Sequence, residues 1–417
     1  MAKKQNSPVF TPDEKKSILG LSLILFFRMS GLFMIFPVFS VLAMELEGST
    51  PMLVGLAMGC YGLTSAFLQI PFGTWSDRAG RKPVLAVAII IFILGSIMAA
   101  MSSNIYTMIL ARFLQGAGAV SAPIFALIAD LTRPEVRARA NAGLGASIGM
   151  AFGVAMFAAP FLAHWLGLSG VFWAITGMAS MSLVILFTFI PSPKVVVPLT
   201  KEKTSVLIRR VLDITPLKTI NLGAFVCSMG LSITFFMTPL LLKENGWDKS
   251  DWWKVYLPML LAGAMTMVPA AIIAETKNKF REVMIVGAIL ILATFVILFL
   301  GQALNSFALN LTAGFLFFMG FNIFEPIFPS LVTRMTDPQT KGTASGVYNF
   351  CQFIGQFLGA MLAGMLYLEY PSTIALVMIV LTLFFIWKTL SFPNPTPREE
   401  KEQTDATPTN KQEGVYN

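Results

Sequence analysis

Three charged side chains lie inside long apolar segments of this chain: Arg28, Arg112 and Glu325. A charge in hydrocarbon is costly, so an ionisable residue at such a position usually serves a function. Glu325 is the one carboxylate that the sequence places well within an apolar segment, and Pro326 beside it loosens the helical hydrogen bonding. Desolvation favours the neutral form of a carboxyl group, which suits a group that takes up and releases a proton. Glu325 could instead bind a cationic substrate or neutralise an arginine.

The two arginines lie at comparable depth in their segments. Arg112 is about eight residues, or roughly 12 Å, from the outer end of its helix, and Arg28 is about twelve residues, or roughly 18 Å, from the inner end of its helix. We therefore interpret Arg112 and Arg28, together with Glu325, as proton-coupling residues. The alternative for either arginine is a structural role, with the guanidinium bound to backbone carbonyls or polar side chains.

A short polar stretch at residues 73–83, GTWSDRAGRKP, separates two of the apolar segments. Its four charges and two glycines predict a tight cytoplasmic loop. Asp77 can accept hydrogen bonds at the positive N-terminal end of a neighbouring helix. The alternative is a positive loop that only fixes the orientation of the chain in the membrane.

The segments that position these residues are those of an all-α polytopic membrane protein. Hydrophobic residues make up 55% of the 417 residues and charged residues only 12%, and a helix needs about 20 apolar residues to cross a bilayer. We predict about twelve transmembrane helices, at residues 17–43, 52–73, 83–102, 105–130, 140–164, 169–191, 217–242, 254–275, 282–302, 306–333, 343–367 and 371–391.

Most of the 30 lysines and arginines fall in the segments that would face the cytoplasm. This distribution predicts that both termini are cytoplasmic and that the chain is a multi-pass protein of the bacterial cytoplasmic membrane. The first span carries a charge and no small-residue cleavage pattern follows it, so we expect a retained helix and not a signal peptide. The positive charges are spread over short segments, which favours contact with anionic lipid and gives no support to nucleic-acid binding.

The chain divides into two halves. We predict a cytoplasmic N-terminal segment at 1–16, a six-helix bundle at 17–191, a linker at 192–216, a second six-helix bundle at 217–391 and a disordered cytoplasmic tail at 392–417. Within the linker Leu207, Val211 and Ile214 recur at helical spacing. They predict a short helix that lies on the membrane surface, and an ordinary solvated loop is the alternative.

Cysteine and histidine give no support to an enzyme. Cys60, Cys227 and Cys351 lie far apart inside apolar spans, so neither a disulfide framework nor a metal site is expected. His164 is the single histidine of the chain, which excludes a zinc protease with two histidines on one helix. A Ser-His hydrolase would have to use that one residue.

Two motifs make the chain resemble the major facilitator superfamily. The stretch from Gly73 to Lys82 has the pattern G-x-x-x-D-R-x-G-R-K, the signature loop of that family. A second motif resembles the Arg-x-x-Gln-Gly-x-Gly-Ala sequence of its drug:proton antiporters, carried by Arg112, Gln115, Gly116, Gly118 and Ala119. The resemblance covers all predicted spans. It implies two pseudo-symmetric six-helix bundles that rock about a central site, and a monomer that moves small molecules.

The resemblance also implies roles for particular residues. The loop would be a conformational switch, in which Asp77 contacts the start of span eleven near Gly342 and Arg81 pairs with Asp130. The remaining switch residues are Gly73, Arg78, Gly80 and Lys82. The substrate cavity would be lined from spans one, four, seven and ten, with further polar groups on two and eleven. Its candidates are Phe36, Tyr61, Gln115, Phe125, Phe235, Phe236, Phe321, Asn322, Tyr348, Asn349 and Gln352.

Glycines at four-residue spacing predict close helix packing where the two halves would rock. They are Gly55 and Gly59, then Gly145, Gly149 and Gly153, then Gly355 and Gly359. The fifth span has Ala159-Pro160 where the antiporters of this family have Gly-Pro, which leaves antiport and symport both open.

We therefore expect a proton-coupled transporter that exports hydrophobic or amphipathic small molecules. Its driving force would be the proton gradient, with no cofactor and no metal. A transporter of one metabolite or siderophore is the alternative within transport, and a receptor or scaffold that moves nothing is the alternative outside it.

Overall fold

The computed structural model describes residues 10–118, 121–191, 204–337 and 340–395. The predicted disordered tail lies almost entirely outside these residues, as does the part of the predicted linker at 192–203. Within the described ranges the chain is almost wholly helical, apart from an isolated bridge between Glu47 and Asn104.

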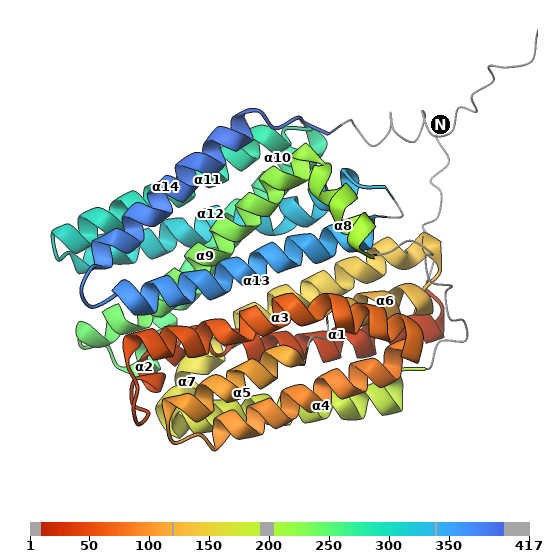
Figure 1. The fold of residues 1–417 in the computed structure, drawn as a ribbon, viewed down its shortest axis with the longest axis horizontal. Coiled ribbons are helices and arrows are strands. Elements are labelled where there is room, and N and C mark those ends of the chain that lie inside the picture. The colour runs from red at the N-terminus through yellow and green to blue at the C-terminus, as the bar shows by residue number, and fades with distance from the viewer. Residues whose placement is uncertain (1–9, 119–120, 192–203, 338–339, 396–417) are drawn as a thin grey trace, which may run out of the picture.

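The first half of the chain forms one helical bundle, drawn from red to yellow in Figure 1. Its helices are α1 (Pro12–Phe33), α2 (Phe39–Ala43), α3 (Pro51–Ala79), α4 (Arg81–Ala100), α5 (Ile105–Ala117), α6 (Ser121–Leu131) and α7 (Pro134–Phe189).

The second half forms a second bundle, drawn from green to blue in Figure 1. Its helices are α8 (Thr204–Asp213), α9 (Thr215–Glu244), the short η1 (Lys249–Asp251), α10 (Trp253–Thr276), α11 (Phe280–Ala303), α12 (Phe307–Arg334), α13 (Lys341–Leu366) and α14 (Pro371–Leu390).

Ten helices among the described residues are long and apolar enough to cross a membrane. The 56-residue α7 contains two predicted spans, because the backbone leaves helical geometry at Gly167, where φ is 62°. The predicted span at 105–130 is divided between α5 and α6. With α7 taken as two spans and α5 and α6 together as one more, the ten long helices become the twelve spans that the sequence predicts.

One predicted span boundary and one predicted loop are wrong. The first span does not continue to residue 43, because α1 ends at Phe33 and α2 begins only at Phe39; Pro37 lies between them, and proline removes a helical hydrogen bond. The predicted tight loop at 73–83 is mostly helix. Only Gly80 interrupts it, with a φ of 95° that glycine adopts without strain.

The predicted linker helix exists as α8, and part of its apolar face packs on protein; its place at the membrane surface stays a prediction. Leu207 and Val211 are buried while Arg209 and Arg210 are exposed. The helix contacts α13 and α9. Its apolar face therefore packs on the second bundle, because protein side chains are available there to bury it.

The two bundles meet along α3 and α13, which run side by side in Figure 1. A Cβ atom on Gly55 would overlap the carbonyl oxygen of Ala360, and one on Gly364 would overlap that of Pro51. These glycines let the two backbones touch. The contact lies at the helix ends that we predict to face outside.

One lysine–carboxylate ion pair and one histidine–carboxylate contact join the bundles at that same end. Lys249 Nζ lies 3.3 Å from Glu45 Oε1, and His164 Nδ1 lies 3.1 Å from Asp248 Oδ1. Each pair links the loop between α9 and α10 to the first bundle. The contacts described here therefore hold the bundles together at the predicted outer end.

The glycine rows differ in what they contact. Gly355 and Gly359 of α13 lie against the α9 backbone at Phe225 and Met229. Nothing lies within 4 Å of a Cβ atom built on Gly145 or Gly149. The α7 row is therefore not a close-packed interface in this structure, because α7 is not pressed on a neighbouring backbone at those turns.

Candidate functional site

Arg28 is held inside the first bundle by polar groups and aromatic rings. Its Nη2 donates to the Tyr61 hydroxyl at 2.8 Å and to the Gly118 carbonyl oxygen at 3.1 Å. The guanidinium lies 3.7 Å from the centre of the Phe92 ring, a favourable cation–π contact. The side chain is 4% exposed, and its Nε and Nη1 have no hydrogen-bond partner among the residues that the structure describes.

Arg112 also lies over the Tyr61 ring. Its Nη1 donates to Gln115 Oε1 at 2.7 Å, and Gln115 Nε2 donates in turn to Ser96 Oγ at 2.8 Å. The two guanidiniums lie 5.5 Å (Arg28) and 5.0 Å (Arg112) from the centre of the Tyr61 ring. Tyr61 therefore connects the two arginines, which sequence spacing could not reveal.

The arginine pair has no counter-charge in its own bundle. Among the residues that the structure describes, no carboxylate forms an ion pair with Arg28 or Arg112. Taking a charge out of water costs several kcal/mol unless another group compensates it. Hydrogen bonds and ring faces supply part of that compensation here, so the site favours an anionic or electron-rich partner.

Glu325 of α12 lies in the second bundle, well within its span as the sequence predicts, and its side chain is accessible to a water-sized probe. The carboxylate interacts electrostatically with Cys227 of α9 and Tyr348 of α13. It follows Phe318 by seven residues, about two helical turns, so both share one helix face. Because Phe318 contacts Phe152 of the first bundle, Glu325 lies on the face that is turned toward the other half.

Rings from both halves form an aromatic cluster between the bundles. Phe36 stacks on Phe235 with ring centres 5.0 Å apart, and Phe235 meets Phe318 at 5.6 Å. Phe152 of α7 lies 6.3 Å from Phe235 and 6.2 Å from Phe318. Phe152 is not among the predicted cavity residues, and nothing in the local sequence of α7 distinguishes it from a lipid-facing phenylalanine.

Other predicted cavity residues lie apart from this cluster. Phe236 packs with Tyr367 inside the second bundle, and Phe321 stacks on Phe317. Phe125 is exposed on α6. We predicted all three as cavity residues; Phe236 and Phe321 instead pack within their own bundle, because neighbouring positions on a helix point to different sides.

The predicted polar cavity residues of the second bundle lie at two positions, on α13 near Glu325 and at the contact between α10 and α12. Tyr348 is buried and accepts a hydrogen bond from Gln352 Nε2 at 3.0 Å. Asn349 is half-buried on the same helix. Asn322 donates to the Phe318 carbonyl oxygen at 2.8 Å and lies against Gly263 of α10. Tyr348 and Gln352 are thus the polar neighbours of Glu325, and Asn322 serves the α10–α12 contact.

The predicted switch residues form a network at the other end of the first bundle. Arg81 Nε lies 3.2 Å from Asp130 Oδ2, as predicted, and Arg81 Nη1 donates to Ser76 Oγ at 2.9 Å. Lys82 Nζ donates to the Ile190 carbonyl oxygen at 2.6 Å. These contacts tie the α3–α4 junction to α6 and to the end of α7.

The contact that we predict between Asp77 and the start of α13 stays a prediction. The Asp77 side chain lies outside the described part of the structure. Gly73 and Gly80 are half-buried and Arg78 is exposed. Gly342, near the start of α13, is exposed and has no atom within 4 Å of a Cβ atom built on it.

Known proteins are similar to this chain in sequence and in fold. Residues 21–360 match the model of the Major Facilitator Superfamily. The chain is 37% identical over 361 residues to the "Inner membrane transport protein YajR" of Escherichia coli (strain K12), covering 86% of this chain and 79% of that protein. It is 25% identical over 345 residues to "Multidrug resistance protein MdtH" of Proteus mirabilis, covering 81% of this chain and 83% of that protein.

A solved structure gives the same fold at low identity. The crystal structure of a D-xylose–proton symporter superimposes with a TM-score of 0.75 at 14% identity, over 92% of this chain and 98% of the symporter chain. The two bundles, the signature sequence at the α3–α4 junction and the family match agree. This chain is a multi-pass membrane transporter and belongs to the major facilitator superfamily.

Proposed function

We propose that this chain is a proton-coupled secondary active transporter that exports hydrophobic or amphipathic small molecules by alternating access. The observation that carries the proposal is the position of Glu325, an exposed carboxylate on the face of α12 that also bears Phe318. A carboxylate between two rocking halves can meet water from one side and then from the other. It can therefore bind a proton in one state and release it in the next.

The aromatic cluster supports an apolar cargo. Phe36, Phe235, Phe318 and Phe152 pack on one another between the bundles in this structure, and their rings would become available to a cargo when the bundles separate. Such surfaces bind hydrophobic molecules with little demand on hydrogen-bond geometry. The relative named as a multidrug resistance protein supports the same cargo class.

The outer contacts suggest how the cycle is organised. Gly55 against Ala360 and the His164–Asp248 pair hold the bundles together at the predicted outer end. We take this arrangement as the state that is closed toward the outside. Cargo and proton would then exchange with the cytoplasm, in a protein of the cytoplasmic membrane whose termini both lie inside.

Replacement of Glu325 by glutamine tests the proposal. Purified protein in liposomes should move ethidium against its gradient when a proton gradient is applied, and Glu325→Gln should lose this flux. Downhill exchange of ethidium should persist, because a permanently neutral side chain represents one state of the cycle. Glu275→Gln is the matched control, since Glu275 pairs with Arg334 at the end of α10. Full gradient-driven flux in Glu325→Gln would refute the proton-coupling role.

A transporter of an anionic metabolite is the second candidate function. The observation that favours it is the pair Arg28 and Arg112, which are buried and have no carboxylate partner among the described residues. Such a site would attract a carboxylate or phosphate group of a cargo. Saturable flux of one organic anion without ethidium flux, lost in Arg112→Gln, would favour this candidate over the first.

A further inference from the structure

The single histidine of the chain lies at the outer contact between the two bundles. His164 belongs to α7, and its Nδ1 lies 3.1 Å from Oδ1 of Asp248, in the connection between α9 and α10. The side chains of His164 and Asp248 keep 37% and 60% of their surface exposed. The contact therefore exists only while the bundles meet at this end, and protons from the outside can reach it.

Asp248 is held in place by the connection to which it belongs. The Ser250 backbone N–H and hydroxyl donate to Asp248 Oδ1, and they lower the pKa of this carboxyl below its ordinary value. His164 and Lys249 lower this pKa further. Trp252 anchors the end of the connection, because its ring is fully buried and its Nε1 donates to a backbone carbonyl oxygen. Asp248 is therefore a fixed carboxylate that keeps its charge where histidine ordinarily titrates, at about pH 6.5.

The other charged groups of this connection have partners of their own. Lys249 Nζ lies 3.3 Å from Oε1 of Glu45 in the first bundle, and Lys254 Nζ lies 2.7 Å from Oδ1 of Asp251. At their ordinary pKa values, lysines and carboxylates keep one charge state between pH 5.5 and 8, whereas histidine changes its charge in this range. These two ion pairs therefore persist while the imidazole titrates.

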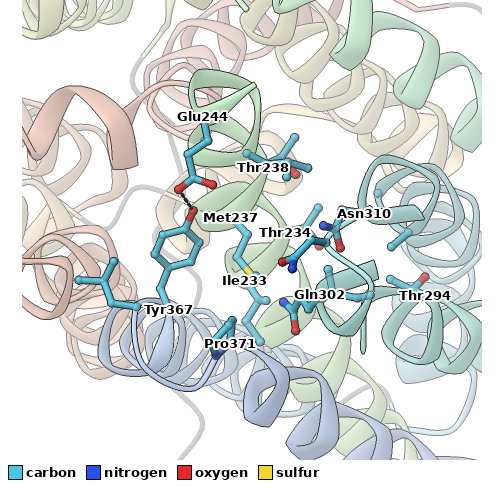
Figure 2. Close-up of a pocket in the computed structure, with 16 residues that line it drawn as sticks. Ile233, Thr234, Met237, Thr238, Glu244, Thr294, Gln302, Asn310, Tyr367 and Pro371 are labelled. Atoms are coloured by element: carbon cyan, nitrogen blue, oxygen red, sulfur yellow. Dashed lines mark hydrogen bonds between the residues drawn. The ribbon is translucent and has the colours of Figure 1, made fainter. Parts of the chain in front are cut away.

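The elements next to this contact direct their polar groups elsewhere. Glu244, at the end of α9, lines a separate cavity of the second bundle and accepts a hydrogen bond from the Tyr367 hydroxyl, marked in Figure 2. In the first bundle, α7 meets α4 just beyond His164 through the Ser169 hydroxyl, which donates to the Ala100 carbonyl oxygen. Asp248 is therefore the charged group that directly contacts the imidazole.

The rest of the outer closure beside His164 is neutral. The Trp253 ring of α10 stacks on Phe161 of α7, with ring centres 6.4 Å apart. The Tyr256 hydroxyl donates to the Pro37 carbonyl oxygen at 3.3 Å. Ring stacking and a phenol hydrogen bond do not change between pH 5.5 and 8. Among the contacts of the described residues named here, the histidine contact is thus the one whose charge follows the outside pH.

We propose that His164 and Asp248 form a pH-sensitive latch, in which protonation of the imidazole holds the outer ends of the bundles together. A protonated imidazole is a cation beside a carboxylate, and charge-assisted hydrogen bonds are stronger than neutral ones. The stabilisation is present when the imidazole is charged and is lost as the pH rises toward 8. An acidic outside therefore favours the state that is closed toward the outside.

The effect of the latch is modest because both side chains are exposed. Exposed ion pairs are screened by water and salt, and they shift an equilibrium by up to about fivefold. In the transport cycle proposed above, the outward-facing state binds a proton from outside and then closes. Protonation of His164 favours the same closing step. This role in the cycle rests on the proposed function, whereas the pH response of the contact does not.

Distances between spin labels test the latch. Met101 and Leu304 are exposed at the outer ends of the first and second bundle, so labels on Met101→Cys and Leu304→Cys report the separation of the two ends. The labelled protein carries Glu325→Gln, so that no titration of Glu325 contributes, and it is measured in nanodiscs without an ion gradient. The ratio of closed to open molecules should be about two- to fivefold higher at pH 5.5 than at pH 8.

Variants of the latch assign this response to its residues. His164→Gln and Asp248→Asn should show the pH 8 ratio at both pH values, and His164→Lys, charged throughout, should show the pH 5.5 ratio at both. Asp251→Asn is the matched control and should respond like the labelled protein, because Asp251 pairs with Lys254 inside the second bundle. Equal ratios at the two pH values before any latch substitution, or an unchanged response in His164→Gln, would overturn the proposal. Loss of proton coupling in the flux assay, by contrast, would leave it standing.

Discussion

Phe36 and Phe235 stack across the two bundles, with ring centres 5.0 Å apart and ring planes 11° from parallel. The contact joins the segment between α1 and α2 to the middle of α9, and Phe235 is fully buried beneath it. In the alternating-access cycle proposed above, the halves would separate here when the outer side opens. The stacked pair would then be present in one state and lost in the other.

Shortening Phe235 should favour separation of the bundles at the outer end. An aromatic pair contributes about 0.5–1.5 kcal/mol beyond area burial, so Phe235→Leu should shift the ratio of the two states by roughly 2- to 12-fold. Distances between spin labels on the outer ends of α3 and α13 measure the shift. Phe236→Leu is the control, because Phe236 packs inside the second bundle. Identical distance distributions in parent and Phe235→Leu would contradict the prediction.

A methyl group at Gly55 should disturb the outer contact, whereas one at Gly149 should have little effect. Gly55→Ala would press on the Ala360 carbonyl oxygen, whereas Gly149 has free space around its Cβ position. Overpacking of this kind costs typically about 1–3 kcal/mol. We expect Gly55→Ala to open the outer contact and to lower transport at least fivefold, and Gly149→Ala to transport at close to the parent rate. Flux assays at matched expression decide between these outcomes.

Removing the Tyr61 hydroxyl should destabilise the arginine pair. Tyr61→Phe deletes the acceptor for Arg28 Nη2 but keeps the ring that both guanidiniums contact. A hydrogen bond to a charged group contributes about 1.5–3 kcal/mol, so thermal stability and transport should both fall. Tyr106→Phe, at an exposed position, serves as the control. Equal melting temperatures of the two variants would show that the hydroxyl carries no such energy.

Acid should weaken the outer contact through Asp248. The Ser250 backbone N–H and hydroxyl donate to Asp248 Oδ1 at 2.8 and 2.7 Å, and they lower the pKa of this carboxyl below its ordinary value of 3.8. Because the pKa is lowered in the folded protein, its contribution is present above pH 3.8 and is lost as the pH falls through the lowered pKa.

Spin-label distances at the outer ends should therefore increase on acidification below pH 3.8. Asp248→Asn should lack this acid transition, because the amide cannot be protonated in this range. Asp251→Asn should keep it, since Asp251 pairs with Lys254 inside the same bundle. An acid transition in Asp248→Asn equal to that of the parent would exclude Asp248 as its source.

The sequence alone determined the spans, their number and the signature motif. Crossing a bilayer requires about 20 apolar residues regardless of neighbours, so each span is a local property of the chain. The pairing of Arg81 with Asp130 followed from the motif, and the two isolated arginines and Glu325 were visible because charges are rare in such segments.

Only the tertiary structure decided which side chains meet. Apolar residues surround a membrane helix on all sides, so periodicity does not tell a lipid-facing Phe from one that contacts the other bundle. The pairing of Phe152 with Phe318 and the shared Tyr61 ring depend on how helices are rotated and tilted against each other. The side chain of Glu325 is accessible for the same reason, because it shares a helix face with Phe318, which meets the first bundle.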